Sequence, residues 1–171
     1  MQENKGKVGL HTEQRMASFK EKLDFGEDGE KDVAIFLMSK GYTVLPLYQF
    51  NKEHAPFLLS ENGKIILPDL DCYHPTNTSI FVEVKSKNQW NVTNSIIETG
   101  FDLKHFDEYV KIQYNTKKEV WVVFNHKGKN QGMYIVALNK FHRKWNGKNK
   151  KGEIKSKALI FYKKEDLKKI N

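Results

Sequence analysis

The feature of this sequence that most constrains its fold is a pair of strand-like runs joined by a short turn-rich segment. The first run, residues 67–71, reads Leu-Pro-Asp-Leu-Asp, and the second, residues 81–85, reads Phe-Val-Glu-Val-Lys. Between them, residues 74–78 read His-Pro-Thr-Asn-Thr, a composition typical of a turn. We therefore expect the two runs to pair as a hairpin.

This pairing gathers charged side chains on one face of the hairpin. Side chains alternate along a strand, so Glu83 and Lys85 point to one face, while the valines beside them point to the opposite layer. Asp69 and Asp71 also share a face, and the hairpin carries Asp69 close to Glu83 and Lys85. Carboxylates held together repel each other unless a cation lies between them, and such oxygen ligands suit Mg²⁺ or Mn²⁺. The alternative is a simple salt bridge between Lys85 and a carboxylate.

A helix is expected upstream of the hairpin, ending at Gly41 and followed by a strand. Glu30 shares a face of this helix with three apolar residues, Ala34, Leu37 and Met38. A carboxylate on a packed face is costly to bury without a partner, and a metal site would supply one. The alternative is that Glu30 and its acidic neighbours only complement the helix dipole.

These segments resemble the PD-(D/E)XK nuclease superfamily. Its signature is Pro-Asp, followed on a second strand by Asp or Glu, any residue, and Lys; here it reads Pro68-Asp69 and Glu83-Val84-Lys85. The helix resembles that of the Holliday-junction-resolvase-like branch, in which a glycine precedes the glutamate and a Gly-aromatic pair closes the helix. The matching positions are Gly26, Glu30, Gly41 and Tyr42. The resemblance covers roughly residues 26–124.

The resemblance implies an α/β fold with a restriction-endonuclease-like core, a mixed β-sheet flanked by helices in the order αβββαβ, with N- and C-terminal additions. It implies that Asp69, Glu83 and the backbone carbonyl of Val84 hold Mg²⁺ or Mn²⁺. Glu30 would complete a second position or orient a water, and Lys85 would orient the attacking water or stabilise developing charge. Asp71 stays open as an alternative ligand to Asp69.

The implied function is a metal-dependent nuclease that hydrolyses phosphodiester bonds. The chain lacks the Gln-x-x-x-Tyr motif of the exonuclease-like branch, which favours a DNA endonuclease, with structure-directed, junction-resolvase-like cutting as one form. Junction resolvases need two active sites, so a homodimer is a further expectation. The alternative is a non-catalytic nucleic-acid-binding module of the same fold.

Composition supports a nucleic-acid partner. The 171 residues carry a formal net charge of +8 and a sequence pI of about 9.4, which favours a polyanion. Cys72 is the only cysteine, which excludes an intramolecular disulfide and a cysteine-rich zinc site. The six histidines lack ligand spacing, and none is assigned to a site. We find neither a long apolar run nor a signal peptide, and expect a cytoplasmic protein without a membrane partner.

The chain divides into a polar N-terminal tail with a short helix, residues 1–22, and a single nuclease-like domain, residues 23–171. A basic C-terminal segment, residues 140–157, can track a phosphate backbone, although a solvated loop explains its composition equally well. The residues expected to contact nucleic acid are Lys87, Arg143, Lys144, Lys148, Lys150 and Lys151.

Beyond the motif, residues 102–115 have the amphipathic spacing of a helix that packs on the sheet. Strands are expected over residues 42–48, 120–124, 133–136 and 158–162, and a terminal helix over residues 164–170. Residues 88–100 show no clean periodicity. Within them, Trp90 either contacts substrate or caps the core.

Overall fold

The computed structural model describes residues 28–48, 55–128, 131–148, 151–154 and 156–171. Residues 28–39 form an N-terminal helix, and α2 spans Leu103–Thr116. Gly26 of the helix motif and the short helix expected in the tail lie outside the described residues. No helix within the described ranges is long and apolar enough to cross a membrane.

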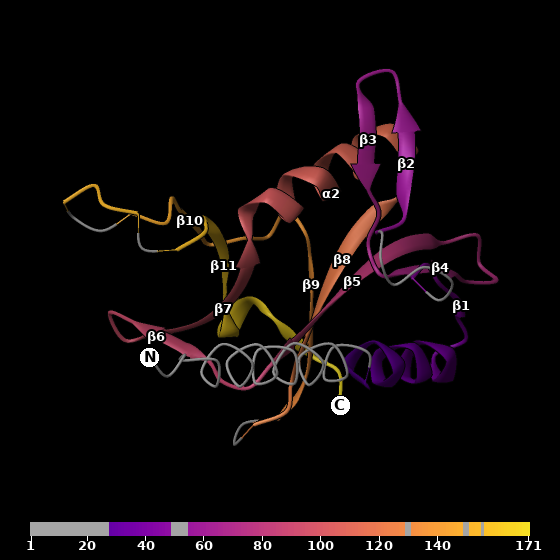
Figure 1. Ribbon diagram of the computed structural model, residues 1–171. Coiled ribbons are helices and arrows are strands. Elements are labelled where there is room, and N and C mark those ends of the chain that lie inside the picture. The colour runs from indigo at the N-terminus through magenta and orange to yellow at the C-terminus, as the bar shows by residue number, and fades with distance from the viewer. Residues whose placement is uncertain (1–27, 49–54, 129–130, 149–150, 155) are drawn as a thin grey trace, which may run out of the picture.

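A six-stranded mixed sheet forms the centre of the fold (Figure 1). Its spatial order is β1 (Thr43–Pro46), β4 (Leu70–Tyr73), β5 (Ser79–Lys87), β8 (Glu119–His126), β9 (Gly132–Ala137) and β12 (Lys168–Lys169). Strands β4 and β5 pair antiparallel, which confirms the hairpin expected from the sequence. Strands β5 and β8 pair parallel, and α2 makes the crossover between them.

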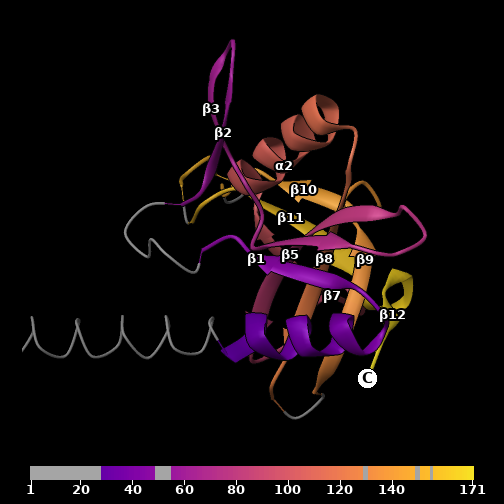
Figure 2. The same ribbon diagram turned by 90° about the vertical axis from the view of Figure 1, so that its right-hand side faces the viewer.

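Strand β5 is buried on both faces because the N-terminal helix and α2 cover opposite sides of the sheet (Figure 2). On the first side, Val33 and Leu37 pack with Val82 and Val84. On the other side, α2 packs in a second cluster around Phe81, whose larger members are Phe101, Phe106, Tyr109 and Phe124. The alternation expected along β5 is therefore confirmed. Glu83 and Lys85 belong to the α2 side.

A second, four-stranded sheet has the order β10 (Arg143–Trp145), β11 (Leu159–Lys163), β7 (Ile96–Asp102) and β6 (Asn91–Thr93). Strands β6 and β7 form a hairpin in the region where the sequence showed no periodicity. Its two-residue turn consists of Asn94 and Ser95, both with positive φ of 49° and 66°. An Asn-Gly pair would have signalled this turn, whereas Asn-Ser does so weakly.

The terminal helix expected over residues 164–170 is wrong. A single 3₁₀ turn, Lys164–Asp166, leads into β12, which pairs antiparallel with β9. The Ile170 N–H donates to the Met133 carbonyl at 2.9 Å, and Leu167 is buried. The edge of β9 therefore provides backbone partners that a short charged helix would lack.

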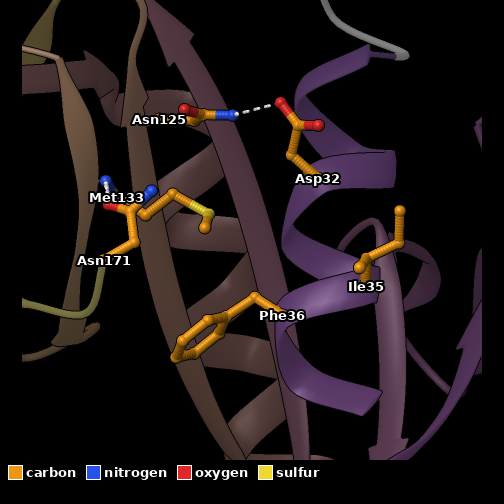
Figure 3. Close-up of a pocket in the computed structure, with 6 residues that line it drawn as sticks. All are labelled: Asp32, Ile35, Phe36, Asn125, Met133 and Asn171. Atoms are coloured by element: carbon orange, nitrogen blue, oxygen red, sulfur yellow. Dashed lines mark hydrogen bonds between the residues drawn. The ribbon is translucent and has the colours of Figure 1, made fainter. Parts of the chain in front are cut away.

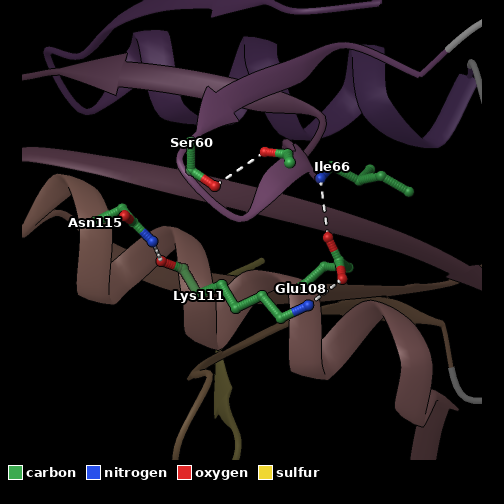
Figure 4. Close-up of polar contacts among 6 residues, drawn as sticks. Ser60, Ile66, Glu108, Lys111 and Asn115 are labelled. Carbon is green, nitrogen blue, oxygen red and sulfur yellow. Dashed lines mark hydrogen bonds and ion pairs between the residues drawn. The ribbon is translucent and has the colours of Figure 1, made fainter.

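A small hairpin, β2 (Phe57–Ser60) with β3 (Gly63–Ile66), projects from the body beside α2 (Figure 1). The Ile66 N–H donates to Glu108 Oε2 of α2 at 3.2 Å, and Lys111 pairs with the same carboxylate (Figure 4). Gly63 has a φ of +104° at the turn. The hairpin separates β1 from β4, so two neighbours in the sheet are distant in the chain.

Arg143 links side chains from several strands of the second sheet. Its guanidinium pairs with both carboxylate oxygens of Glu98, which is 1% exposed, and Nε lies 3.0 Å from Glu98 Oε2. The Thr93 hydroxyl donates to Glu98 Oε1 at 2.9 Å, and the guanidinium lies 4.1 Å from the centroid of the Phe161 ring. Glu98 on β7 thus connects to β6 and β10.

We expect Arg143→Met to lower the free energy of unfolding by about 3 kcal/mol, because it leaves Glu98 buried without its cation. Lys144→Met, at the exposed neighbouring position, is the matched control and should change stability by less than about 0.5 kcal/mol. Urea unfolding measures both. Equal stabilities for the two variants would contradict this role of Arg143.

Candidate active site

The hairpin of β4 and β5 places two carboxylates side by side. Asp69 immediately precedes β4, and the pairing of Leu70 with Val82 sets Asp69 opposite Glu83. The Val84 N–H donates to Asp69 Oδ2 at 2.7 Å, which fixes the aspartate against β5. Asp69 is 9% exposed and Glu83 is 1% exposed. Two acidic groups are therefore buried on adjacent strands.

Lys85 joins this pair on the same face of β5. Its ammonium pairs with Glu83 Oε1 and lies 5.9 Å from the centroid of the Phe101 ring. Burial alone would lower the pKa of Lys85, but the carboxylates of Glu83 and Asp69 outweigh it and raise the pKa. Lys85 is therefore a charged group and a hydrogen-bond donor at neutral pH.

The carboxylates carry more negative charge than the neighbouring cation balances. Burial raises the pKa of Asp69 well above its ordinary value, and the charges of Glu83 and Glu30 raise it further, against the opposing effect of Lys85. Glu83 Oε2 is buried and has no hydrogen-bond partner in the described part of the chain. An additional cation would relieve both the repulsion and the missing partner.

Glu30, in the first described turn of the N-terminal helix, lies near enough to this cluster for its charge to act on it. It is half-buried, and its charge raises the pKa of Asp69 and, together with burial and the other carboxylates, that of Tyr48. A Cβ at Gly29 would lie 2.0 Å from Ser86 Oγ, so glycine lets the helix start approach β5 closely. The expected face was partly wrong, because Met38 is 53% exposed.

Asp71, the alternative ligand, is engaged elsewhere. Its carboxylate pairs with the Lys118 ammonium and accepts a hydrogen bond of 2.6 Å from the Tyr73 hydroxyl. Asp71 is also absent from the charges that act on Asp69. The geometry therefore favours Asp69 over Asp71 as the partner of Glu83.

Three side chains near the carboxylates were missed in the sequence. Tyr48 follows Leu47, whose N–H donates to the Asp69 carbonyl at 2.9 Å, and burial together with the charges of Asp69 and Glu83 raises the pKa of Tyr48. Tyr109 of α2 is buried, and its pKa is raised by burial, by the charges of Glu83 and Asp69, and by a side-chain hydrogen bond to Glu83. Burial and then Lys85 lower the pKa of His105.

Tyr109 and His105 lie four residues apart on α2, so they share one face of the helix. Their polar atoms on that face could have been recognised from the sequence. The sequence pattern identified that face only as part of the core. Tyr48 gave no comparable signal, because its position depends on the backbone contact of Leu47 with Asp69.

Comparison with solved structures shows that the chain has a known fold. Hjc, a Holliday junction resolvase from Archaeoglobus fulgidus, is similar over 85% of this chain and 91% of its own, with a TM-score of 0.54 and 12% sequence identity. The chain has a restriction-endonuclease-like fold. D212, a nuclease from a fusselovirus, gives a TM-score of 0.41 at 12% identity, over 99% of this chain and 91% of that one. No family model matches the chain, and a search of curated proteins finds no significant relative.

The α/β fold and the PD-(D/E)XK resemblance expected from the sequence are thus confirmed at the level of fold. The αβββαβ core corresponds to the N-terminal helix, β1, β4, β5, α2 and β8. The β2–β3 and β6–β7 hairpins are inserted into this order. The second sheet, including β10 and β11, is added to it.

The donor chemistry of the carboxylate cluster fits an oxygen-bound divalent cation. Asp69 and Glu83 supply carboxylates, and the orphaned Glu83 Oε2 lacks a partner that a cation would provide. Across the described ranges, no three His, Cys, Asp or Glu side chains group closely enough to bind a metal by themselves. A cation here therefore needs further donors, for which the backbone carbonyl of Val84 and Glu30 remain the predicted sources.

The basic residues expected to contact nucleic acid are scattered in the fold. Lys87 lies two residues beyond Lys85 on the same face of β5 and is half-buried. Lys144 lies over the Phe106 and Phe141 rings, at 5.1 and 5.4 Å from their centroids. Lys148 and Lys151 are exposed, and Lys150 lies outside the described residues. The charge of Arg143 is offset by Glu98, and its contact with nucleic acid stays a prediction.

An open pocket of about 280 Å³ lies between the N-terminal helix and β8 and β9 (Figure 3). Asp32, Phe36, Asn125 and Met133 are among its lining residues, and Asn125 Nδ2 donates to Asp32 Oδ2 at 3.4 Å. Neither Asp69 nor Glu83 lines it. The pocket is thus separate from the carboxylate cluster.

The raised pKa of Asp69 predicts the pH dependence of the metal-free protein. Between the ordinary pKa of 3.8 and the raised value, the folded chain keeps a proton that the unfolded chain has lost. Stability should therefore fall as pH rises through this window, with a slope of up to about 1.4 kcal/mol per pH unit from this one group. Asp69→Asn removes the charge and should raise metal-free stability at neutral pH.

The matched control is Asp71→Asn, which removes the ion pair with Lys118 and should lower stability instead. Thermal unfolding across the acidic and neutral range, in the presence of a chelator, measures both variants. A loss of stability in Asp69→Asn at neutral pH would show that the cluster is not electrostatically strained.

Proposed function

We propose that this protein is a metal-dependent nuclease that hydrolyses phosphodiester bonds in nucleic acid, with DNA as the substrate. The observation that carries the proposal is the burial of Asp69 and Glu83 side by side, with Lys85 on the same face. Two carboxylates buried side by side repel each other, and they also repel a phosphate group. It becomes useful for phosphate chemistry when a divalent cation reverses the local charge.

Each residue has a distinct role in this proposal. Asp69, Glu83 and the Val84 carbonyl hold Mg²⁺ or Mn²⁺, with Glu30 completing a second position or orienting a water. When bound, the cation offsets the charge that develops on the phosphate and lowers the pKa of a water. The raised pKa of Lys85 makes it a poor base at neutral pH. It therefore acts as a donor, orienting the attacking water or stabilising the developing negative charge.

We propose an endonuclease directed by DNA structure rather than by sequence. The similarity in fold to a Holliday junction resolvase supports this choice, as does the absence of the Gln-x-x-x-Tyr motif. The net charge of +8 supports extensive contact with phosphates. A homodimer would place two such sites on one branched substrate.

A non-catalytic nucleic-acid-binding module of the same fold is the second candidate. Two observations favour it: the Lys85 ammonium is paired with Glu83, and the described residues contain no ready three-ligand cation group. In that reading Lys85 only neutralises a buried carboxylate. Activity and metal binding of the same variants separate the two candidates.

Lys85→Ala should lower turnover by about 100-fold or more while Mn²⁺ binding persists, because it removes a donor to the transition state. Asp69→Ala should abolish both cleavage and metal binding. Lys118→Ala is the matched lysine control, since Lys118 pairs with Asp71 and not with Glu83. Cleavage is measured with Mg²⁺ or Mn²⁺ on single-stranded, duplex, flapped and four-way DNA and on RNA. Full activity of Lys85→Ala would rule out its assigned role.

Glu30→Gln should reduce cleavage by about 10- to 100-fold without unfolding the chain, because the amide keeps the shape and loses the charge that acts on Asp69. Asp28→Asn is the control, because Asp28 is an exposed carboxylate in the same helical turn. If Glu30 only complemented the helix dipole, both variants would lose a similar amount of stability and neither would lose activity.

A further inference from the structure

Beyond Lys85, the same face of the sheet carries a second group of cationic and aromatic side chains. Lys87 of β5 is the cross-strand partner of His126 of β8. The His126 ring stacks on Trp90, with centroids 3.9 Å apart and an interplanar angle of 3°, and meets Tyr134 edge-on at 5.9 Å. The Lys164 ammonium lies 5.0 Å from the Trp90 centroid and 6.0 Å from that of Tyr134.

The polar atoms of this group are buried without partners. His126 is 2% exposed, and neither of its ring nitrogens has a hydrogen-bond partner among the described residues; the same holds for Trp90 Nε1. A buried donor without an acceptor is costly, and a structure keeps such groups where a ligand or water supplies the missing bond. These atoms therefore indicate that a ligand or a buried water supplies hydrogen bonds to this group.

The charges of this group are also unbalanced. Neither Lys87 nor Lys164 has a carboxylate within ion-pairing distance in the part of the chain that the structure describes. Burial lowers the pKa of His126 to about 4, with help from the charges of Lys87 and Lys164, so both ammonium groups act on the neutral ring. Burial and then Lys85 lower the pKa of Lys87, and Asp102 opposes them. Such crowded positive charge favours an anion.

We propose that Lys87, beside His126 on the neighbouring strand, and Lys164, over the Trp90 ring, together bind a backbone phosphate next to the one that is cleaved. This inference rests on the proposed function, because it takes nucleic acid as the substrate. Lys85 and Lys87 are two residues apart, so their Cα atoms are separated by about 6.6 Å along the strand. That separation is close to the distance between successive phosphates of one nucleic-acid strand. The bound strand therefore runs along β5, from Lys85 toward Lys87.

Of the two expectations for Trp90, packing on the core is confirmed, and the site adds a contact with a cation. Trp90 packs against the core and at the same time forms the surface on which the Lys164 cation lies. Its contact with the Trp90 ring limits the conformational freedom of Lys164, so binding a phosphate there costs less conformational entropy.

The test is DNA binding by the double variant Lys87→Gln, Lys164→Gln, measured in a chelator so that no cleavage occurs. The matched control is Lys40→Gln, Lys117→Gln, which removes the same charge. Both lysines are exposed. Lys40 lies at the opposite end of the N-terminal helix from Glu30, and Lys117 lies at the opposite end of α2 from His105. Each lysine is therefore about 15 Å or more along its helix from the site. A labelled four-way DNA junction and a duplex are titrated over a range of salt concentrations.

The double variant should bind more weakly and lose about one unit of salt slope in total, because the two lysines contact one phosphate, whereas the control should keep the wild-type slope. Methylphosphonate substitution, walked along the DNA strand, should identify one phosphate whose neutralisation weakens binding by wild type and control but not by the double variant. A slope and a methylphosphonate profile equal to those of the control would overturn the inference. That result would leave Lys164 as a cation that only packs on the Trp90 ring and Lys87 as a lysine without a role in binding DNA.

Thermal unfolding of each variant checks that it folds, and Lys164→Gln alone serves if the double variant does not. The outcomes separate this inference from the proposed function. Wild-type protein that binds DNA with the predicted lysine dependence but never cleaves it would overturn the nuclease proposal and support the phosphate site. An active nuclease with an unchanged slope in the double variant would overturn the phosphate site alone.

Discussion

The close approach of two buried carboxylates at the start of β4 and the middle of β5 is the constraint on which the rest of the structure depends. Asp69 and Glu83 are held together by backbone geometry, through the strand register and the hydrogen bond from Val84 to Asp69. Their repulsion is offset only in part by Lys85. A fold maintains such an arrangement at a cost in stability, and the proposed cation at this position would explain why it is kept.

Packing of the surrounding helices and strands offsets this electrostatic cost. Strand β5 is covered on both sides, by Val33 and Leu37 of the N-terminal helix and by the aromatic cluster of α2. The parallel pairing with β8 fixes β5 on its other edge and brings His126 beside Lys87. The two-sided burial that anchors the carboxylates thus also positions the cationic and aromatic group next to them. The proposed catalytic residues and the proposed phosphate contact of Lys87 would then both lie on β5.

Much of this arrangement could be predicted from the sequence because it depends on local patterns. The alternation along residues 81–85, the turn residues between the strands and the amphipathic spacing of α2 each follow from short-range geometry. The hairpin pairing and the phase of Glu83 and Lys85 were therefore accessible. The motif match added the order of the core elements.

The remaining features depend on contacts between residues distant in the chain. The last residues form a strand because β9 has a free edge, which their own composition does not indicate. Arg143 looked like a phosphate contact, yet it is the partner of Glu98, 45 residues away. Trp90, His126 and Lys164 come from three separate segments, so no spacing in the sequence relates them.

The central claim is that Asp69 and Glu83 form a cation site. The most direct test is a crystal of the wild-type protein soaked in Mn²⁺, with the ion located by its anomalous scattering. The account predicts a peak between the Asp69 and Glu83 carboxylates, with Lys85 moved from its pairing with Glu83. A peak elsewhere, or no peak while the Lys85–Glu83 pair stays intact, would contradict it.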